Sequence, residues 1–300
     1  NLMRSCDLSL KGLDLKSMEE KMTYDGHTGN VLALSIVNGM LWSGGLDKTI
    51  RSWDIKSGKG KDIIKMSSSV ISMEFTTNNI FAACDDLIYS LDIKTKEVAL
   101  RYQGHTGLIS CMKVVEMDAA GGKLFTGSWD NTIKVFKLPT AECIGTLKGH
   151  KDFVSCLAIQ GQTLFSGSLD KTVVGWDVLA GTALQTFTCP EVPQCLAVDK
   201  NVILVGLQNG NTIMLDARTF EVKHTFVGHT DAVRCIKLVE GGRFFTGSKD
   251  KTIKCWDLQD STTKKPGEPG TAEKDAQAAA GADGKKAADG KGKAKGKKSK

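Results

Sequence analysis

One recurring unit constrains the fold of this chain more than any other feature. Four stretches of similar sequence stand out: "SGGLDKTIRSWD" (43–54), "TGSWDNTIKVFK" (126–137), "SGSLDKTVVGWD" (166–177) and "TGSKDKTIKCWD" (246–257). A Gly-His pair precedes each copy, and its His lies 20, 25, 20 and 21 residues before the turn Asp. From that Asp to the aromatic residue the spacing is always six. Repeats of this length pack against their neighbours to build one continuous core.

Two weaker copies lie between the four strong ones. They are "ACDDLIYSLD" (83–92) and "LQNGNTIMLD" (207–216), which keep the rhythm without Gly-His or Trp, so the period is 38–45 residues. Segments such as "VLALSIV" and "AVRCIKLV" are short and rich in β-branched or apolar residues, and Gly, Asp, Asn and Lys turns separate them. This pattern predicts many short strands and an all-β fold.

The Gly-His pairs, the turn Asp and the Trp-Asp ends together resemble the WD40-repeat family over residues 23–257. Four correctly spaced copies make the resemblance specific, whereas a single Trp-Asp would mean little. The resemblance implies a β-propeller, in which blades of four antiparallel strands surround a central channel.

The first residues of the chain bear on the number of blades. The stretch "RSCDLSLKGLD" (4–14) aligns without a gap with "AACDDLIYSLD" (82–92), and residues 19–25 would follow it as an outer strand. We therefore prefer seven blades with the first one incomplete, residues 1–25 being a partial repeat interrupted inside a blade. Six blades are the alternative, if residues 19–25 close the last blade. The full repeats are expected at about 26–65, 66–103, 104–148, 149–188, 189–227 and 228–257, in a propeller domain of residues 1–257.

In WD40 propellers the recurring Asp, His, Ser or Thr and Trp form a buried hydrogen-bonded chain. The resemblance places such tetrads at Asp47/His27/Ser43/Trp53, at Asp170/His150/Ser166/Trp176 and at Asp250/His229/Thr246/Trp256. The third repeat has Asp130, His105 and Thr126, but Phe136 replaces the Trp and removes the terminal donor. The residue types suit the roles: a carboxylate acceptor, a two-nitrogen ring, a hydroxyl and a donor-only indole.

An Asp-His-Ser set could also be a hydrolase triad. Catalysis needs one exposed, activated serine beside an oxyanion site, whereas here the trio recurs four times. The repetition favours a structural role, so no catalytic residue is assigned. The nine cysteines include no CxxC pair, and Cys111, Cys156, Cys195 and Cys235 occupy matching places in their repeats. They are interpreted as small buried residues, and no metal or cofactor is expected.

Partner binding is expected on the rim that the family uses for this purpose. The residue before the turn Asp is Leu46, Trp129, Leu169 or Lys249, and the residue three after the His is Asn30, Leu108, Phe153 or Ala232. Apolar side chains at such places are typical of an interaction surface. The predicted partner-binding residues are Leu46, Leu108, Trp129, Phe153, Leu169 and Lys249. The alternative is that the insertion "VVEMDAAGGKLF" of the third repeat folds over Trp129.

Residues 258–300 form a tail of different composition. It holds 11 Lys against 6 acidic residues, a charge of +5 out of the +6 of the whole chain, and from residue 261 onward it has no aromatic residue, Ile, Leu or Val. Such a segment cannot bury a core and is predicted to be disordered. It could contact polyanions such as RNA or DNA nonspecifically, direct nuclear import, or have no distinct role.

No apolar run approaches the ~20 residues of a membrane span, and no secretory signal is visible. We expect a cytoplasmic or nuclear protein with reduced thiols, not a secreted one, and no small-molecule substrate.

The favoured function is a non-catalytic protein-interaction scaffold. Its repeats resemble the propellers of F-box and RING/TRAF ubiquitin ligases and those attached to zinc fingers or kinases, which recruit substrates or partners. The alternatives are a structural subunit of an RNA-processing, ribosome-associated or ciliary assembly, and an enzyme.

Overall fold

The computed structural model describes residues 8–14, 19–116, 121–258 and 275–277 of the chain, and all its regular elements are β-strands. In chain order they are β1 (Leu10–Leu13), β2 (Glu20–Tyr24), β3 (Val31–Val37), β4 (Met40–Gly45), β5 (Thr49–Asp54), β6 (Gly60–Lys65), β7 (Val70–Phe75), β8 (Asn79–Cys84), β9 (Leu87–Asp92), β10 (Val98–Tyr102), β11 (Ile109–Val115), β12 (Lys123–Ser128), β13 (Thr132–Lys137), β14 (Cys143–Lys148), β15 (Val154–Gln160), β16 (Thr163–Ser168), β17 (Thr172–Asp177), β18 (Thr182–Thr188), β19 (Pro193–Asp199), β20 (Val202–Leu207), β21 (Thr212–Asp216), β22 (Val222–Phe226), β23 (Val233–Val239), β24 (Arg243–Ser248), β25 (Thr252–Asp257) and β26 (Asp275–Gln277).

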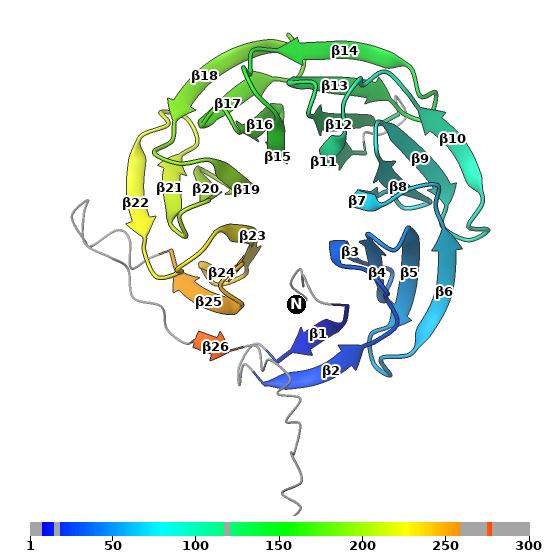
Figure 1. Cartoon of the computed structure of the whole chain (residues 1–300). Coiled ribbons are helices and arrows are strands. Elements are labelled where there is room, and N and C mark those ends of the chain that lie inside the picture. The colour runs from blue at the N-terminus through cyan, green and yellow to red at the C-terminus, as the bar shows by residue number, and fades with distance from the viewer. Residues whose placement is uncertain (1–7, 15–18, 117–120, 259–274, 278–300) are drawn as a thin grey trace, which may run out of the picture.

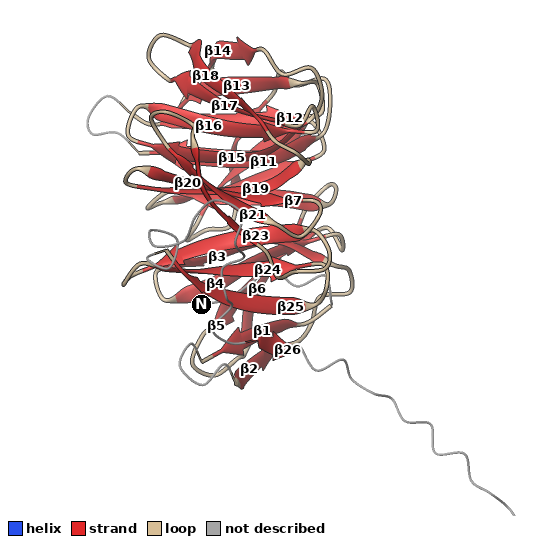
Figure 2. Cartoon of the chain, turned by 90° about the vertical axis from the view of Figure 1, so that its left-hand side faces the viewer, coloured by secondary structure: helices blue, strands red, loops and turns tan. Residues whose placement is uncertain are grey.

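These strands form a β-propeller, which confirms the predicted all-β architecture. Figure 1 looks along the central channel and shows the blades arranged around it, while Figure 2 shows the ring from the side. Each blade is an antiparallel sheet of consecutive strands, the innermost lining the channel and the outermost lying on the circumference. No helix long and apolar enough to cross a membrane occurs among the described residues.

The core lies between blades. On the facing sheets of the β11–β14 and β15–β18 blades, Phe125, Ile133, Leu157 and Trp176 are at most 4% exposed and pack into one cluster. Similar clusters fill the gaps between the other successive sheets, from β1–β2 to the β23–β26 blade. Both faces of most blades are thus covered, so the second strand of each complete blade is buried almost throughout, whereas third strands such as β5 and β13 still alternate. The repeat is the unit of packing as well as of sequence.

The blade number has features of both alternatives given above. Six blades have four strands, and β1 and β2 form a two-stranded sheet beside them. In Figure 1 this sheet occupies its own place in the ring, between the β3–β6 blade and β25. The ring thus has six complete blades and, at the place where an incomplete first blade was expected, two strands. Residues 1–7, the rest of the predicted partial repeat, lie outside the described residues.

The tail prediction needs a correction at three residues. Strand β26, which falls in the segment 258–300 predicted to be disordered, pairs with β25 and completes the last blade. The physical reason is the outer edge of β25, whose backbone donors and acceptors gain hydrogen bonds from any extended segment within reach. Residues 259–274 and 278–300 lie outside the described residues, and their disorder stays a prediction.

Candidate functional site

The β15–β18 blade brings together the four residues assigned to its tetrad. His150 Nδ1 lies 3.0 Å from Asp170 Oδ2, and His150 Nε2 lies 2.7 Å from Ser166 Oγ. The indole N–H of Trp176 donates to Ser166 Oγ at 2.8 Å. This hydrogen-bonded chain ties the turn Asp at one end of the blade to its two middle strands.

The β3–β6 blade contains a complete tetrad of the same geometry. His27 Nδ1 lies 2.7 Å from Asp47 Oδ2, and His27 Nε2 lies 2.7 Å from Ser43 Oγ. The indole N–H of Trp53 donates to Ser43 Oγ at 2.8 Å. Ser43 and Trp53 are buried, so water does not compete for this bond. Ser43 is thus the central member of this hydrogen-bonded network, and Trp53 is its last donor.

The β23–β26 blade contains the third complete tetrad, with a Thr in place of the Ser. His229 Nδ1 lies 2.7 Å from Asp250 Oδ2, and His229 Nε2 lies 2.8 Å from Thr246 Oγ1. The indole N–H of Trp256 donates to Thr246 Oγ1 at 2.8 Å, and both side chains are buried. The hydroxyl of Thr246 therefore does what the Ser hydroxyl does in the other two blades.

The β11–β14 blade carries the shorter version. His105 contacts Asp130 at 2.7 Å and Thr126 at 2.8 Å, while the fully buried Phe136 occupies the Trp position. The ring of Tyr102 meets Phe136 edge-on, with ring centroids 5.6 Å apart. Packing therefore replaces the hydrogen bond that an indole would give in this blade.

One member of these networks was not predicted from the sequence. A Thr two residues after the turn Asp donates its hydroxyl to that carboxylate at 2.6–2.8 Å in all four blades, at Thr49, Thr132, Thr172 and Thr252. The recurring "DKT" and "DNT" triplets were the signal that could have revealed it. The residue between the two, Lys or Asn, has φ between 60° and 68°, which makes the turn tight enough for this bond.

The networks hold their ionisable groups in fixed states. Burial lowers the pKa of His27, His105 and His150, and their contacts with Asp only partly oppose this. Burial alone would raise the pKa of each partner Asp, but hydrogen bonds from Thr, from the backbone and from His lower it, and for Asp250 it falls to about 2. The three His therefore stay neutral beside a carboxylate, and a neutral imidazole with one N–H suits a relay between acceptor and hydroxyl.

These directions predict that acid destabilises the propeller. Between the lowered pKa of the folded histidines and the ordinary value of about 6.5, the unfolded chain binds more protons than the native one, so stability rises with pH. It should therefore fall as the pH drops below about 6.5, and fall again below about 4 as the unfolded Asp carboxylates take up protons. Urea midpoints measured from pH 7.5 to 3.5 at constant ionic strength test this. A urea midpoint that stays level or rises as the pH is lowered from 7.5 to 5 would contradict this prediction.

In each of the four blades with an Asp-His pair, a backbone hydrogen bond joins the two rim positions. The amide of Trp129 donates to the carbonyl of Leu108 at 2.9 Å, and the amide of Leu169 donates to that of Phe153 at 2.9 Å. The same 2.9 Å bond joins Leu46 to Asn30 and Lys249 to Ala232. The side chains at these paired positions consequently lie next to each other on the face that carries the tetrad turns.

An aromatic pair joins two of these clamps. The rings of Trp129 and Phe153, from neighbouring blades, are stacked with centroids 4.9 Å apart and an interplanar angle of 2°. Trp129 is 48% exposed, Leu46 44% and Leu169 38%, while Leu108 and Phe153 are half-buried. We call Leu46, Leu108, Trp129, Phe153, Leu169 and Lys249 the rim patch. Lys249 is exposed and pairs with Asp231 at 3.6 Å.

The insertion of the third repeat does not start beside Trp129. It leaves β11 at Val115 and enters β12 at Lys123, whereas Trp129 follows the other end of β12, after Ser128. At about 3.3 Å per residue, a six-residue strand separates these ends by roughly 17 Å. Residues 117–120 of the insertion lie outside the described residues. The described part of the chain leaves about half of the Trp129 side chain exposed to solvent.

The repeats that carry these networks match a known protein family. The family described as "WD domain, G-beta repeat" matches residues 18–54, 96–137, 141–177 and 220–257, which together make up more than half of the chain. The chain belongs to the WD40-repeat family. The four matched segments are those that contain the strong copies, and the Trp-less copies lie between them.

Curated WD40 relatives share a moderate part of the sequence. An uncharacterised WD repeat-containing protein of Schizosaccharomyces pombe is 27% identical over 56% of this chain and 49% of its own length. The human kinesin-like protein KIF21A is 25% identical over 89% of this chain and 18% of its own length. The zinc finger CCCH domain-containing protein 62 of Arabidopsis thaliana is 29% identical over 51% and 38%. This chain therefore spans less than half of each of these relatives.

A solved structure supports the fold of the WD40 propeller. The crystal structure of the computationally designed Ika8 protein superposes with a TM-score of 0.72, covering 92% of this chain and 83% of the other at 23% identity. At that identity the likeness extends to the fold alone.

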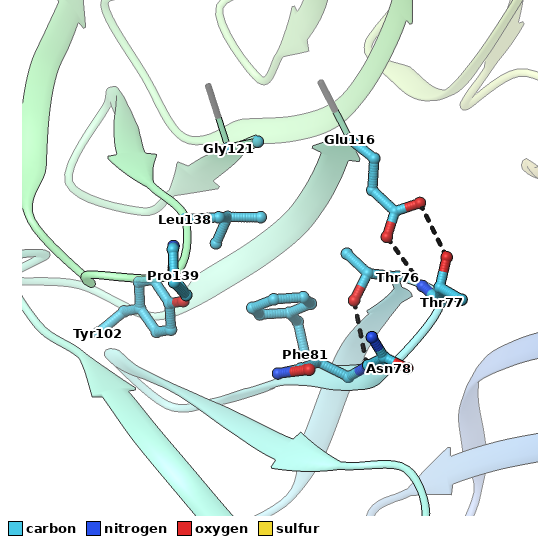
Figure 3. Close-up of a pocket in the computed structure, with 11 residues that line it drawn as sticks. Thr76, Thr77, Asn78, Phe81, Tyr102, Glu116, Gly121, Leu138 and Pro139 are labelled. Atoms are coloured by element: carbon cyan, nitrogen blue, oxygen red, sulfur yellow. Dashed lines mark hydrogen bonds between the residues drawn. The ribbon is translucent and has the colours of Figure 1, made fainter. Parts of the chain in front are cut away.

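The opposite face of this WD40 propeller has a hollow of about 520 Å³ between the β7–β10 and β11–β14 blades (Figure 3). Phe81, Tyr102 and Leu138 form its apolar part. At its polar end the Glu116 carboxylate accepts from the amide of Thr77 at 2.8 Å and from its hydroxyl at 3.3 Å. Burial raises the pKa of Tyr102 to about 12, which keeps its phenol neutral. The Glu116 bonds join two blades, so this carboxylate is engaged in packing.

The cysteines singled out in the sequence lie on the channel strands. Cys156 and Cys195 are buried and Cys111 and Cys235 half-buried, and none of these four forms a disulfide. Their sulfurs lie against the adjacent strand: a Cβ on Gly167 would stand 2.7 Å from Cys156 Sγ. Burial also raises the pKa of Cys156, which makes it a poor nucleophile. Among the described residues, no three His, Cys, Asp or Glu side chains are grouped as metal ligands.

Proposed function

We propose that this WD40 propeller is a non-catalytic scaffold that captures a partner protein on the rim patch. The observation that carries the proposal is the stacked pair of Trp129 and Phe153, which presents a broad aromatic surface to solvent at the junction of two blades. Burying such rings against an apolar side chain of a partner gains free energy at little cost in side-chain entropy, since stacking already restricts their rotation.

The neighbours of the pair support the same reading. Leu108 and Leu169 lie on either side through the backbone clamps, so aliphatic groups flank the rings. An aromatic centre with an aliphatic surround is the composition of an interface core, where Trp is a preferred hot-spot residue. Leu46 and Lys249 lie on other blades and would contact only a partner that extends across the face. The WD40 propeller is typically a binding fold, which agrees with this proposal.

The test is a double substitution with a matched control. We expect Trp129→Ala with Leu169→Ala to reduce partner binding by more than about 30-fold, because each removes a hot-spot contact. Affinity capture with quantitative mass spectrometry compares this variant with the native chain and with Ile63→Ala. Ile63 is 60% exposed on the outer strand β6, away from the patch, so its removal controls for the general loss of exposed apolar surface.

Proteins that the native chain captures specifically should be depleted in the capture by the double variant and retained in the capture by Ile63→Ala. Thermal midpoints of all three proteins, expected to agree within a few degrees, show that folding is unaffected. Capture of the same proteins by the double variant at native levels would refute the proposal.

We further propose that the propeller recruits a substrate or partner for a larger regulatory protein of the ubiquitin ligase or kinase type. Matches to a kinesin-like protein and a zinc finger protein, in which the shared part is less than half of the relative, support a role as one module among others. A cytoplasmic or nuclear location fits cysteines that form no disulfide among the described residues. The alternative of a structural subunit with polyanion contacts depends on the Lys-rich tail, and stays a prediction.

A further inference from the structure

The outermost strand of the β15–β18 blade differs from the other outer strands in its charge. Strand β18 reads "TALQTFT" and has no charged residue, and the uncharged stretch extends from Val178 to Pro190. Each of the other outer strands carries at least one: the charged residues are Glu20 and Lys21 in β2, Lys61, Asp62 and Lys65 in β6, Arg101 in β10, Lys148 in β14, Lys223 in β22, and Asp275 in β26.

Strand β18 is also long and exposed. It has seven residues, of which all but Phe187 are exposed, and it pairs only with β17 in the described part of the chain. Leu184 is 59% exposed, and Leu179 in the preceding turn 62%. On the neighbouring blade Ile144, 45% exposed, occupies the matching bulge position of β14. The circumference of these two blades therefore combines an open strand edge with apolar side chains.

Open edges of this kind are normally protected. Proteins place Lys or other charges on edge strands because an unguarded edge pairs with the edge of another chain. The other outer strands of this propeller follow the rule and β18 breaks it. An edge that is kept free of charge over its whole length is suited to forming β-pairs with a second strand.

We propose that β18 is a self-association edge, where two copies of this chain pair antiparallel about a two-fold axis. The charge pattern favours a second copy over an unlike partner. In a two-fold pair each side chain near the axis lies close to its own copy, so any charge there would meet the same charge. An uncharged strand avoids this repulsion, whereas an edge meant for an unlike strand could use complementary charges.

The register of β18 indicates where the pair would form. Gln185–Thr188 pair regularly with β17, and a bulge interrupts the ladder before Gln185. The side-chain amide of Gln185 also donates to the Thr219 carbonyl of the next blade at 2.8 Å, which holds the strand in place. Pairing of Gln185–Phe187 with its copy about Thr186 would place Thr186 opposite Thr186 of the second copy and Gln185 opposite Phe187. Thr and aromatic residues favour such cross-strand pairs.

The experiment measures the mass of the full chain by sedimentation velocity and light scattering up to about 100 μM, since small interfaces bind weakly. We expect a concentration-dependent dimer. Thr186→Lys and Thr186→Asp should each be monomeric, because like charges meet near the axis, and an equimolar mixture of the two should dimerise again. Ile63→Lys is the matched control: Ile63 pairs with Arg51 of β5 as Thr186 pairs with Val174 of β17, and dimerisation should be unchanged.

Several results would overturn the proposal. They are a native chain that stays monomeric up to that concentration, a Thr186→Lys dimer as stable as the native one, and a mixture of the two charged variants that stays monomeric. Thr186 is exposed, so these substitutions leave the core untouched, and circular dichroism should show native spectra for each variant.

Discussion

Replacing Asp170 by Ala is expected to lower the free energy of unfolding by about 3–5 kcal/mol, because it leaves the buried His150 and the half-buried Thr172 without their acceptor. The carboxylate accepts from His150 Nδ1, from the amide of Lys151 at 2.9 Å, and from the amide and the hydroxyl of Thr172 at 2.9 Å and 2.6 Å. Its side chain is only 9% exposed, so water cannot take over all of these bonds. Urea denaturation should show a midpoint lowered by more than about 1 M.

Asp86→Ala is the control for this substitution. Asp86 lies in the corresponding turn of the β7–β10 blade, which has no tetrad, and its side chain is exposed. Removing it should change stability by less than about 0.5 kcal/mol. A loss at Asp170 no greater than the loss at Asp86 would mean that the tetrad contributes nothing to blade stability.

Gly210→Ala is the second substitution with a large expected effect. Gly210 lies in the turn between β20 and β21 with φ of 92°, and a Cβ there would stand 2.4 Å from the carbonyl oxygen of His229 and 2.9 Å from its carbonyl carbon. Both atoms belong to the backbone of the next blade and cannot rotate away. We expect a loss of about 3 kcal/mol from the strained dihedral and the clash together.

Gly39→Ala separates these two contributions. Gly39 has φ of 71°, but a Cβ on it would meet nothing within 4 Å. Its loss should be about 1 kcal/mol, from backbone conformation alone. Thermal or urea unfolding of both variants tests the difference, and equal losses at the two positions would show that the approach of His229 to Gly210 is not a constraint on the fold.

Repetition explains how much of this molecule was predictable from its sequence. A pattern that recurs at fixed spacing reports a shared environment, so the blades and the partners of His27, His150 and His229 could be placed from spacing and resemblance alone. The Trp-less copies were located by rhythm, and they form complete four-stranded blades. The Thr after each turn was overlooked although it recurs, because Lys-Thr and Asn-Thr turns look like ordinary surface sequence.

Features that depend on two blades at once could not be predicted. The stacking of Trp129 on Phe153 requires both side chains to adopt matching torsion angles across a junction, and no spacing in the chain encodes this. The pairing of β26 with β25 escaped prediction because its sequence, "DAQ", carries no strand signal. There the open edge of β25 decides the conformation, and local propensity does not.

The two-stranded sheet β1–β2 has a consequence for how the ring fluctuates. Among the described residues, two strands form this sector where four form every other, so it offers the least sheet surface for packing against its neighbours. Small breathing motions should start at this seam and fade around the circumference in both directions. The junction of the β11–β14 and β15–β18 blades lies at the far side of the ring (Figure 1). Trp129 and Phe153 therefore lie between two four-stranded blades and away from this sector, so a partner would meet side chains already held in place by packing.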